Sequence, residues 1–151
     1  MTSPANVSLV RIRLARGKDA PRIAQLSGQL GYPTTAAEMR KRLTSVLRDR
    51  CGACFIAETT ERGVTGWLHV TVTPLLEVPR RAEVNGLVVD EQVRGRSTGW
   101  LLLQAAEKWA RKMKCKCISV RSNIVRERAH AFYLGHQYEH YKTQKAFQKT
   151  L

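Results

Sequence analysis

The loop between residues 90 and 100 holds the residue types best suited to bind a ligand. A predicted strand ends before this loop and a predicted helix begins after it, and Arg94, Gly95 and Arg96 lie between them. Backbone N–H groups at a helix start have no partner within the helix, and the helix dipole is positive there. Gly95 and Gly99 let the main chain approach a ligand closely, and both arginines add positive charge. The loop predicts a cradle for a pyrophosphate; the alternative is an ordinary strand-to-helix turn with a solvated arginine pair.

Four cysteines form two close pairs, Cys51 with Cys54 and Cys115 with Cys117. Four thiolates can hold zinc, and a CxxC pair can carry redox chemistry. However, the second pair is one residue shorter than the usual zinc spacing, and no helix follows Cys51 to lower its pKa. We therefore expect small buried hydrophobic cysteines and no metal site. Three histidines also lack a carboxylate or cysteine at metal-binding spacing: His69, His136 and His140.

The hydrophobic pattern predicts one mixed α/β domain spanning residues 1–151, with no internal repeat or linker. We expect strands over 7–14, 54–58, 64–72, 82–89 and 117–121, and one or two closing strands over 138–151. We expect helices from an Asp19 N-cap to Gly31, from a Thr34 or Thr35 N-cap through Leu47, and over 98–114 and 126–134. This order places the helices around a central sheet.

Composition sets the class of protein. The chain has 151 residues, of which 43% are hydrophobic, and this suffices for one core. The formal charge of +14 excludes an acidic disordered chain and favours a polyanionic ligand or partner. Residues 90–151 alone carry thirteen basic and five acidic residues. No apolar run is long enough to span a membrane, and the N-terminus lacks a signal-peptide pattern, so we expect a cytoplasmic protein.

A later segment, NIVRERAHAFYLGHQY, begins at Asn123, 24 residues after Gly99. In this order and spacing, the loop and this segment resemble the acyl-CoA-binding motifs of the GNAT superfamily of N-acetyltransferases. The loop resembles the Arg/Gln-x-x-Gly-x-Gly/Ala signature at Arg94, Ser97 and Gly99. The later segment resembles Asn…Ala-x-x-Phe-Tyr-x-x-x-Gly-Phe/Tyr. The similarity is strongest over residues 83–151 and implies a central mixed, mostly antiparallel sheet flanked by about four helices.

Three positions depart from the family pattern. Ser97 stands where the family most often has Gly, and Thr98 replaces the usual aliphatic residue. Gln137 replaces the Gly that precedes Tyr138. Serine is small and can cap a helix N-terminus, so we expect Ser97 to be tolerated and to bond a phosphate oxygen.

The resemblance implies an acetyl-CoA-dependent N-acetyltransferase in which the amine attacks the thioester directly. The strand residues Leu87, Val88 and Val89 would pair with the pantetheine arm, and Asn123 would reach that arm from the next strand. Phe132 joins these as a cofactor-binding residue. The pyrophosphate would rest on a run of seven residues: Arg94, Gly95, Arg96, Ser97, Thr98, Gly99 and Trp100.

The resemblance also suggests two catalytic residues. Tyr133 lies where the family often has the phenol that protonates the leaving thiolate; the alternative is an aromatic that packs against Phe132. Glu83 would act as general base through a water, sharing a face with Asn85 and Leu87 by strand alternation. The alternative is that Glu83 has no catalytic role and is either a solvated carboxylate or one that is salt-bridged near Arg80 and Arg81.

The partner expected from the resemblance is a small-molecule or peptide amine, in a homodimer that uses no metal and no membrane. Polycationic amines would be repelled by the overall charge unless acids such as Glu38 and Glu77 line the entrance. Two other functions stay open: a basic module that binds nucleic acid or an acidic protein, and a GNAT-fold protein that binds acyl-CoA without turnover. No nucleic-acid motif is visible, and aromatic residues make up only 7% of the chain.

Overall fold

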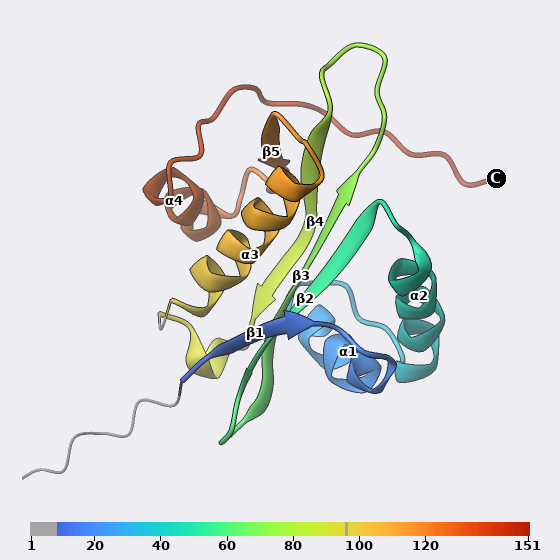
Figure 1. The fold of residues 1–151 in the computed structure, drawn as a ribbon, viewed down its shortest axis with the longest axis vertical. Coiled ribbons are helices and arrows are strands. Elements are labelled where there is room, and N and C mark those ends of the chain that lie inside the picture. The colour runs from blue at the N-terminus through green and yellow to red at the C-terminus, as the bar shows by residue number, and fades with distance from the viewer. Residues whose placement is uncertain (1–8, 96) are drawn as a thin grey trace, which may run out of the picture. The chain divides into compact units, whose positions relative to one another are not determined.

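The computed structural model describes residues 9–95 and 97–151, and these form two compact units: a first unit that ends at Arg121, and a second unit, Ser122–Leu151. The first unit holds a five-stranded sheet in the order β1-β2-β3-β4-β5 (Figure 1). Its strands are β1 (Arg11–Leu14), β2 (Gly52–Thr59), β3 (Gly63–Val72), β4 (Arg81–Val89) and β5 (Cys117–Val120). Neighbouring strands are antiparallel except β4 and β5, which are parallel. The expected α/β class with a mixed, mostly antiparallel sheet is confirmed.

The helices of the first unit cover both faces of this sheet (Figure 1). They are α1 (Ala20–Gln29), α2 (Ala36–Arg48) and α3 (Thr98–Lys112), with short 3-10 turns at Gly17–Asp19 and Glu91–Val93. A Cβ added at Gly66 in β3 would lie 3.2 Å from Leu102, so this face of β3 packs against α3. On the other face, Ile56 of β2 is fully buried in a cluster with residues of α1 and α2. Side chains alternate along a strand, so each strand supplies both cores.

The two expected helix starts differ in how they are stabilised. Thr35 caps α2, because its hydroxyl accepts from the Glu38 N–H at 3.1 Å, and the Glu38 carboxylate accepts from the Thr35 N–H in return. Asp19 occupies the N-cap position of α1 but makes no capping bond there. Its carboxylate instead binds the Arg13 guanidinium at 2.8 Å and accepts from the Arg16 N–H. The hydrogen bond from Arg13 lowers the pKa of Asp19, against the effect of burial.

The second unit contains one helix, α4 (Glu127–Gly135), and no strand. The predicted closing strands are therefore wrong: residues 138–151, all of which are described, form neither helix nor strand. A strand needs a neighbouring strand to bond its N–H and C=O groups, and this unit offers none. Most residues of this segment are exposed.

The prediction of buried cysteines is right for Cys54 and wrong elsewhere. Cys54 lies in the core with Ile56, and burial raises the pKa of its thiol to about 12. Cys51 and Cys117 are exposed, and Cys115 is half-buried. Cys51 precedes β2 and Cys117 begins the edge strand β5, where fewer neighbours cover a side chain. Within the described residues, no three potential ligands are grouped so that they could hold a metal ion.

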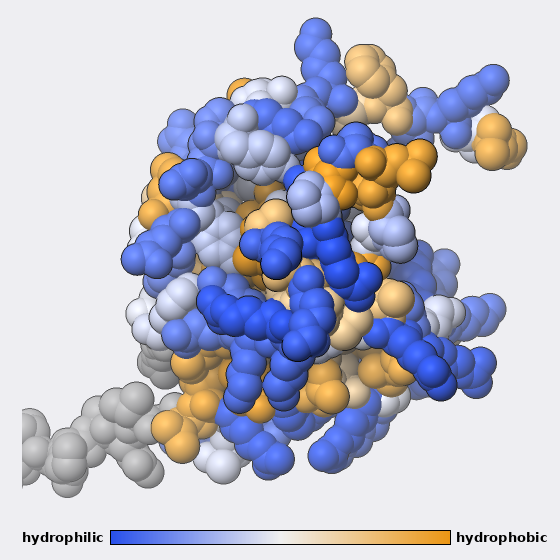
Figure 2. All heavy atoms as spheres, turned by 45° about the horizontal axis from the view of Figure 1, so that its top comes forward, coloured by the Kyte–Doolittle hydropathy of each residue, from blue (hydrophilic) through white to orange (hydrophobic). Residues whose placement is uncertain are grey.

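Hydrophilic side chains cover most of the face shown in Figure 2, and hydrophobic ones appear there in smaller groups. In the part of the chain that is described, no helix has the length and apolar character needed to cross a membrane.

Candidate functional site

The edge of β4 opens halfway along the strand. Residues Arg81–Val84 pair with Cys117–Val120 of β5, and beyond Val84 the described part of β4 pairs with β3 alone. The predicted pantetheine-binding residues, Leu87, Val88 and Val89, lie in this second half. A strand edge without a neighbour presents backbone N–H and C=O groups that an extended ligand can bond. The parting of β4 and β5 therefore makes a binding edge for an extended chain.

A β-bulge marks the place where the strands part. Val70 of β3 lies opposite Val84, whereas the preceding His69 lies opposite Gly86. Asn85 is thus the extra residue on β4, and its Nδ2 donates to the Thr71 hydroxyl at 2.8 Å. Bulges shift the side-chain alternation of a strand by one residue and are frequent beside functional sites.

The bulge overturns the expected orientation of Leu87. Glu83 lies opposite Thr71, and Leu87 lies opposite Leu68. Since Thr71 and Leu68 are three residues apart in β3, they point to opposite faces of the sheet. Leu87 therefore faces α3, while Glu83 faces the side of α1 and α2. Simple alternation along β4 placed these residues on one face, because it did not include the inserted Asn85.

Asp90, the first residue after β4, anchors the predicted cradle to α1. Its carboxylate binds the Arg22 guanidinium at 2.6 Å and accepts from the Gln92 N–H at 3.1 Å and from Gln29 at 3.4 Å. The Gln29 side-chain oxygen also accepts from the Glu91 N–H at 3.0 Å. Sequence reasoning missed this role. One signal was available in the sequence. Arg22 and Gln29 lie seven residues apart and therefore on one face of α1, where two long polar side chains can bind the same acid.

The environment of Asp90 keeps it ionised. Burial opposes the charge, but hydrogen bonds from the Gln92 N–H, Arg22 and Gln29 outweigh it, so the pKa of Asp90 lies below the ordinary 3.8. Its side chain is 11% exposed and that of Arg22 is 32% exposed. A lowered pKa means that the folded state favours the ionised form of Asp90 more strongly than the unfolded state does, so the ionised carboxylate adds to the stability of the fold.

The Asp90→Asn variant is expected to unfold more easily by about 2 kcal/mol, less than a fully buried pair because Arg22 is partly exposed. The contribution of Asp90 is present above pH 3.8 and is lost as the pH falls through its lower folded-state pKa, so the difference from wild type shrinks in acid. Urea unfolding at neutral and acidic pH measures this. The control is Asp49→Asn, since Asp49 is exposed and accepts from the Cys51 N–H, which Asn also allows. Equal losses in both variants would contradict the anchoring role.

The loop reaches α3 through two residues with left-handed backbone conformations. Gly95 has φ +84° and Ser97, the N-cap residue of α3, has φ +63°. Glycine adopts such angles freely, whereas serine does so at a cost, which gives a physical reason for the family's Gly at this position. Arg94 lies between Asp90 and Gly95, and its Nε donates to the Val89 carbonyl at 3.2 Å. Arg96 lies outside the described residues.

The expected capping by Ser97 is wrong: its side chain makes no capping hydrogen bond to α3. A capping side chain normally comes from a residue with extended backbone, and the left-handed Ser97 does not meet this condition. Thr98 is 3% exposed, and Gly99 and Trp100 complete the first turn of α3. Ser97 thus does not cap α3 with its side chain, and the positive end of the helix dipole lies at this residue.

Glu83 is held by a residue that sequence reasoning did not name as its partner. The Arg121 Nε lies 2.5 Å from Glu83 Oε1, and the Glu83 side chain is 26% exposed. Arg80 instead donates to the Met113 carbonyl at 2.8 Å. Arg121 directly follows β5, so this ion pair sits where β4 and β5 part. The structure thus places a charged pair, and not a solvated carboxylate, on this strand.

The second unit contains the other predicted residues. The Asn123 side-chain oxygen accepts from the Val125 N–H at 3.1 Å, and this turn leads into α4. Tyr133 packs edge-on against Phe132, with ring centroids 5.2 Å apart, and tilts against Tyr138 at 5.8 Å. Burial raises the pKa of Tyr133 to about 12, and the nearby charge of Arg126 only partly opposes this. The phenol is therefore protonated at neutral pH.

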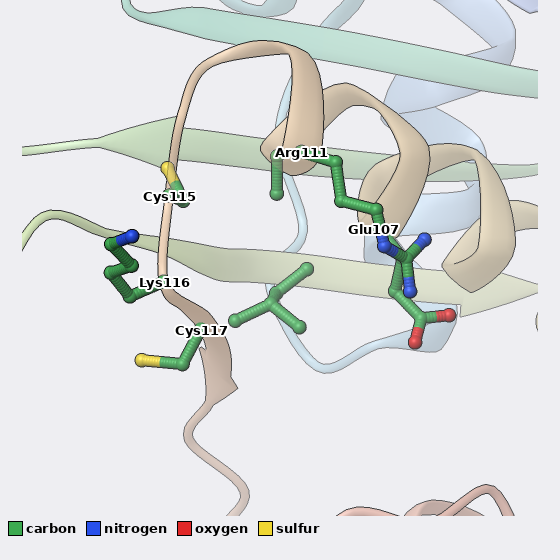
Figure 3. Close-up of a pocket in the computed structure, with 7 residues that line it drawn as sticks. Glu107, Arg111, Cys115, Lys116 and Cys117 are labelled. Carbon is green, nitrogen blue, oxygen red and sulfur yellow. The ribbon is translucent and has the colours of Figure 1, made fainter.

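A small pocket lies elsewhere in the first unit, at the C-terminal end of α3 (Figure 3). Its volume is about 120 Å³, and it is lined by Glu107, Ala110, Arg111, Cys115, Lys116, Cys117 and Ile118. None of the predicted site residues lines it. Pockets for cofactor-sized ligands hold roughly 300 Å³ or more, so this pocket is too small for an acyl-CoA.

Comparison with solved structures identifies the fold. An aminoglycoside N-acetyltransferase in complex with CoA matches with a TM-score of 0.86 and 14% identity, over 99% of this chain and 100% of that chain. An aminoglycoside 6′-N-acetyltransferase from Acinetobacter baumannii matches with a TM-score of 0.82 and 14% identity, over 94% and 99%. A transcriptional regulator from Bacillus halodurans matches with a TM-score of 0.80 and 22% identity, over 92% and 100%. At these identities, the matches establish the fold.

A family model establishes the relationship by sequence. The model of the acetyltransferase (GNAT) family matches residues 21–136, which include β4, the loop, α3 and α4. No curated protein matches the chain. Because the family model covers more than half of the sequence, this chain belongs to the acetyltransferase (GNAT) family.

Proposed function

We propose that this protein is an acetyl-CoA-dependent N-acetyltransferase, and that residues 1–151 work as one domain. The observation that carries the proposal is the opened edge of β4 beside an anchored loop at the start of α3. The family model supports it by spanning parts of both units, and one solved neighbour is an acetyltransferase in complex with CoA. A strand edge that can bond an extended arm, next to a loop that can hold phosphates, suits a ligand that has both an extended arm and phosphate groups.

The chemistry of these groups fits acetyl-CoA. The backbone of Leu87–Val89 would bond the pantetheine arm, and the loop from Arg94 to Trp100 would hold the pyrophosphate. Arg94 is exposed and adds positive charge, while Gly95 bears no side chain that would block the main chain. Asn123 and Phe132 complete the proposed cofactor residues. When bound, acetyl-CoA supplies a thioester whose acetyl group an amine can accept.

We assign the two proton transfers to Glu83 and Tyr133. Glu83 takes a proton from the substrate ammonium through a water, which leaves a neutral amine. As the N–C bond forms and the C–S bond breaks, Tyr133 gives its proton to the departing sulfur. The acetylated nitrogen releases its second proton to solvent, and solvent reprotonates Tyr133. A phenol with a pKa of about 12 is uncharged at rest and donates to a strongly basic thiolate. Arg121 contacts Glu83 at Oε1, which leaves Oε2 for the water.

The proposed acceptor is a small-molecule or peptide amine. The aminoglycoside acetyltransferases among the structural neighbours support a small molecule. A homodimer and a cytoplasmic location are part of the same proposal, and light scattering and cell fractionation test them. The alternatives are a basic module for nucleic acid and an acyl-CoA-binding protein without turnover.

Calorimetric titration with acetyl-CoA tests the proposal. We expect binding that survives moderate salt and weakens strongly in an Arg94→Ala variant, since a cradle is partly shielded from screening. Arg111→Ala is the matched control, because Arg111 is exposed in the last turn of the same helix. Absence of binding, or binding that salt abolishes equally in all three proteins, would overturn the proposal and favour a nucleic-acid partner. Binding without turnover on any amine would favour the non-catalytic protein.

A further inference from the structure

The ion pair between Glu83 and Arg121 leaves most of the guanidinium unused. Arg121 contacts Glu83 Oε1 through its Nε, and its side chain is 78% exposed. Within the described residues, neither of its Nη groups has a hydrogen-bond partner. A guanidinium carries five N–H donors in a planar fork that matches a carboxylate with two parallel bonds. Glu83 thus holds Arg121 in place by one nitrogen and leaves the outer edge of the fork to a ligand.

This fork lies on the face of the sheet where Glu83 also points. Arg121 is next in alternation after Ser119, which lies opposite Glu83, so both charged side chains share the face that carries Thr71. The face looks away from α3, and the ion pair sits where β4 and β5 part. Glu83 uses one oxygen for Arg121, which leaves its second oxygen for a proton.

The charges of this face are unfavourable for a polycation. Arg81 of β4 and Arg121 after β5 share this face with Glu83, so this part of the sheet contributes one net positive charge. Burial lowers the pKa of His69 on the same face, which keeps that ring neutral at pH 7. Glu38, one of the acids expected at an entrance, is occupied by Thr34 and by the cap of α2. The charge of Asp49, which follows α2, acts on His69 in the opposite sense to burial. Glu83, the carboxylate that β4 contributes to this face, already has a cation as its partner.

We infer that the acceptor amine carries a carboxylate a few bonds from its amino group, and that Arg121 binds this carboxylate while Glu83 receives the proton of the amine. Arg121 is then the residue that selects the acceptor. The inference rests on the proposed function and narrows its substrate class to amino acids and similar compounds. It separates this chain from its aminoglycoside-acetylating neighbours, because an aminoglycoside carries several positive charges and no carboxylate.

Matched pairs of amines test the inference. Acetyl transfer is measured as thiol release with glycine, leucine and phenylalanine, each beside its amide, and with spermidine and kanamycin. We expect at least one acid to exceed its amide by about 30-fold or more in kcat/KM, as for loss of a bidentate charged contact. Arg121→Gln is expected to abolish that preference, because KM for the acid rises far more than KM for its amide. Arg121→Lys keeps the charge without the fork and should restore only part of the preference.

Lys116→Gln is the control, since it makes the same charge change in the segment before β5. Its preference should equal that of wild type. A preference for amides or polycations, or an equal loss in the Arg121 and Lys116 variants, would overturn the inference.

A second measurement separates this inference from the proposed function. In protein labelled with ¹⁵N-arginine and saturated with CoA, the Arg121 Nε–H resonance is identified by its absence in Arg121→Gln. We expect at least one of the three acids to shift this resonance, and the amides to leave it in place. No shift with any of the three acids overturns the inference even if acetyl-CoA binds. Failure of acetyl-CoA to bind in the calorimeter overturns the proposed function instead.

Discussion

The Ser97→Asp variant is expected to bind acetyl-CoA at least about 100-fold more weakly than wild type while remaining as stable. Ser97 is the N-cap residue of α3 and has φ +63°. Aspartate tolerates this conformation better than most residues, and a negative charge at a helix start is favourable in the absence of ligand. The variant should therefore fold normally.

The loss of affinity follows from the charge that the variant adds. A carboxylate about 5 Å from one phosphate charge costs about 3 kcal/mol at an effective dielectric constant of about 20. A pyrophosphate carries more than one such charge, and the new carboxylate would also compete for the N–H groups that the phosphate needs. Both effects act on the bound state, whereas the stability of the free protein is spared.

Calorimetry and urea unfolding measure the two properties separately. Ser97→Asn is the matched control, because asparagine has nearly the same shape and tolerates the same backbone angle without a charge. It should bind acetyl-CoA within a few-fold of wild type. Ser97→Gly removes the backbone cost and is expected to raise the free energy of unfolding by about 1 kcal/mol. If the Asp and Asn variants bind alike, the pyrophosphate does not rest on the start of α3.

Tyr133→Phe is expected to lower kcat by about 100-fold and to leave the affinity for acetyl-CoA nearly unchanged. The change removes one hydroxyl and keeps the ring that packs against Phe132. Because burial raises the pKa of Tyr133 to about 12, the phenol stays protonated up to that pH. Deprotonation of Tyr133 should therefore cause no fall in kcat between about pH 7 and pH 10.

Steady-state rates across this pH range, with the best acceptor found by screening, measure the effect. Tyr138→Phe is the matched control, since it removes the same hydroxyl from the ring beside Tyr133. We expect its kcat to stay within about 3-fold of wild type, since it supplies no proton to the sulfur. A Tyr133→Phe protein with wild-type kcat would remove Tyr133 as the acid, and another group or solvent would then protonate the thiolate.

Local sequence signals predicted the elements and their order correctly for most of the chain. The helix over 98–114 is observed as Thr98–Lys112, and the Thr35 cap occurs where expected. Such signals act within one or two turns, so residues close in sequence suffice to specify them. The Gly-containing basic loop before a helix is a signal of the same kind, which is why the candidate cradle was visible without a structure.

Contacts between distant residues were decided only by the tertiary structure. Asp90 meets Arg22 from 68 positions away, and Glu83 meets Arg121 across two strands. The Asp19 carboxylate binds Arg13 of the preceding strand β1 and makes no capping hydrogen bond to α1. Nothing in the residues beside each acid distinguishes the arginine it will meet, since that choice depends on how the strands and helices pack.

The sequence by itself determined the family, the order of elements up to α4 and the candidate loop for a cofactor, because these depend on short-range patterns. The tertiary structure decided which face of the sheet each side chain of β4 points to, and whether the C-terminal segment forms strands. The bulge at Asn85 turns Leu87 toward α3, which alternation alone does not predict. Residues 138–151 have apolar residues that suggested strands, yet form none, because a strand exists only where another strand offers its backbone. Pairing is a property of two segments, and a single segment does not encode it.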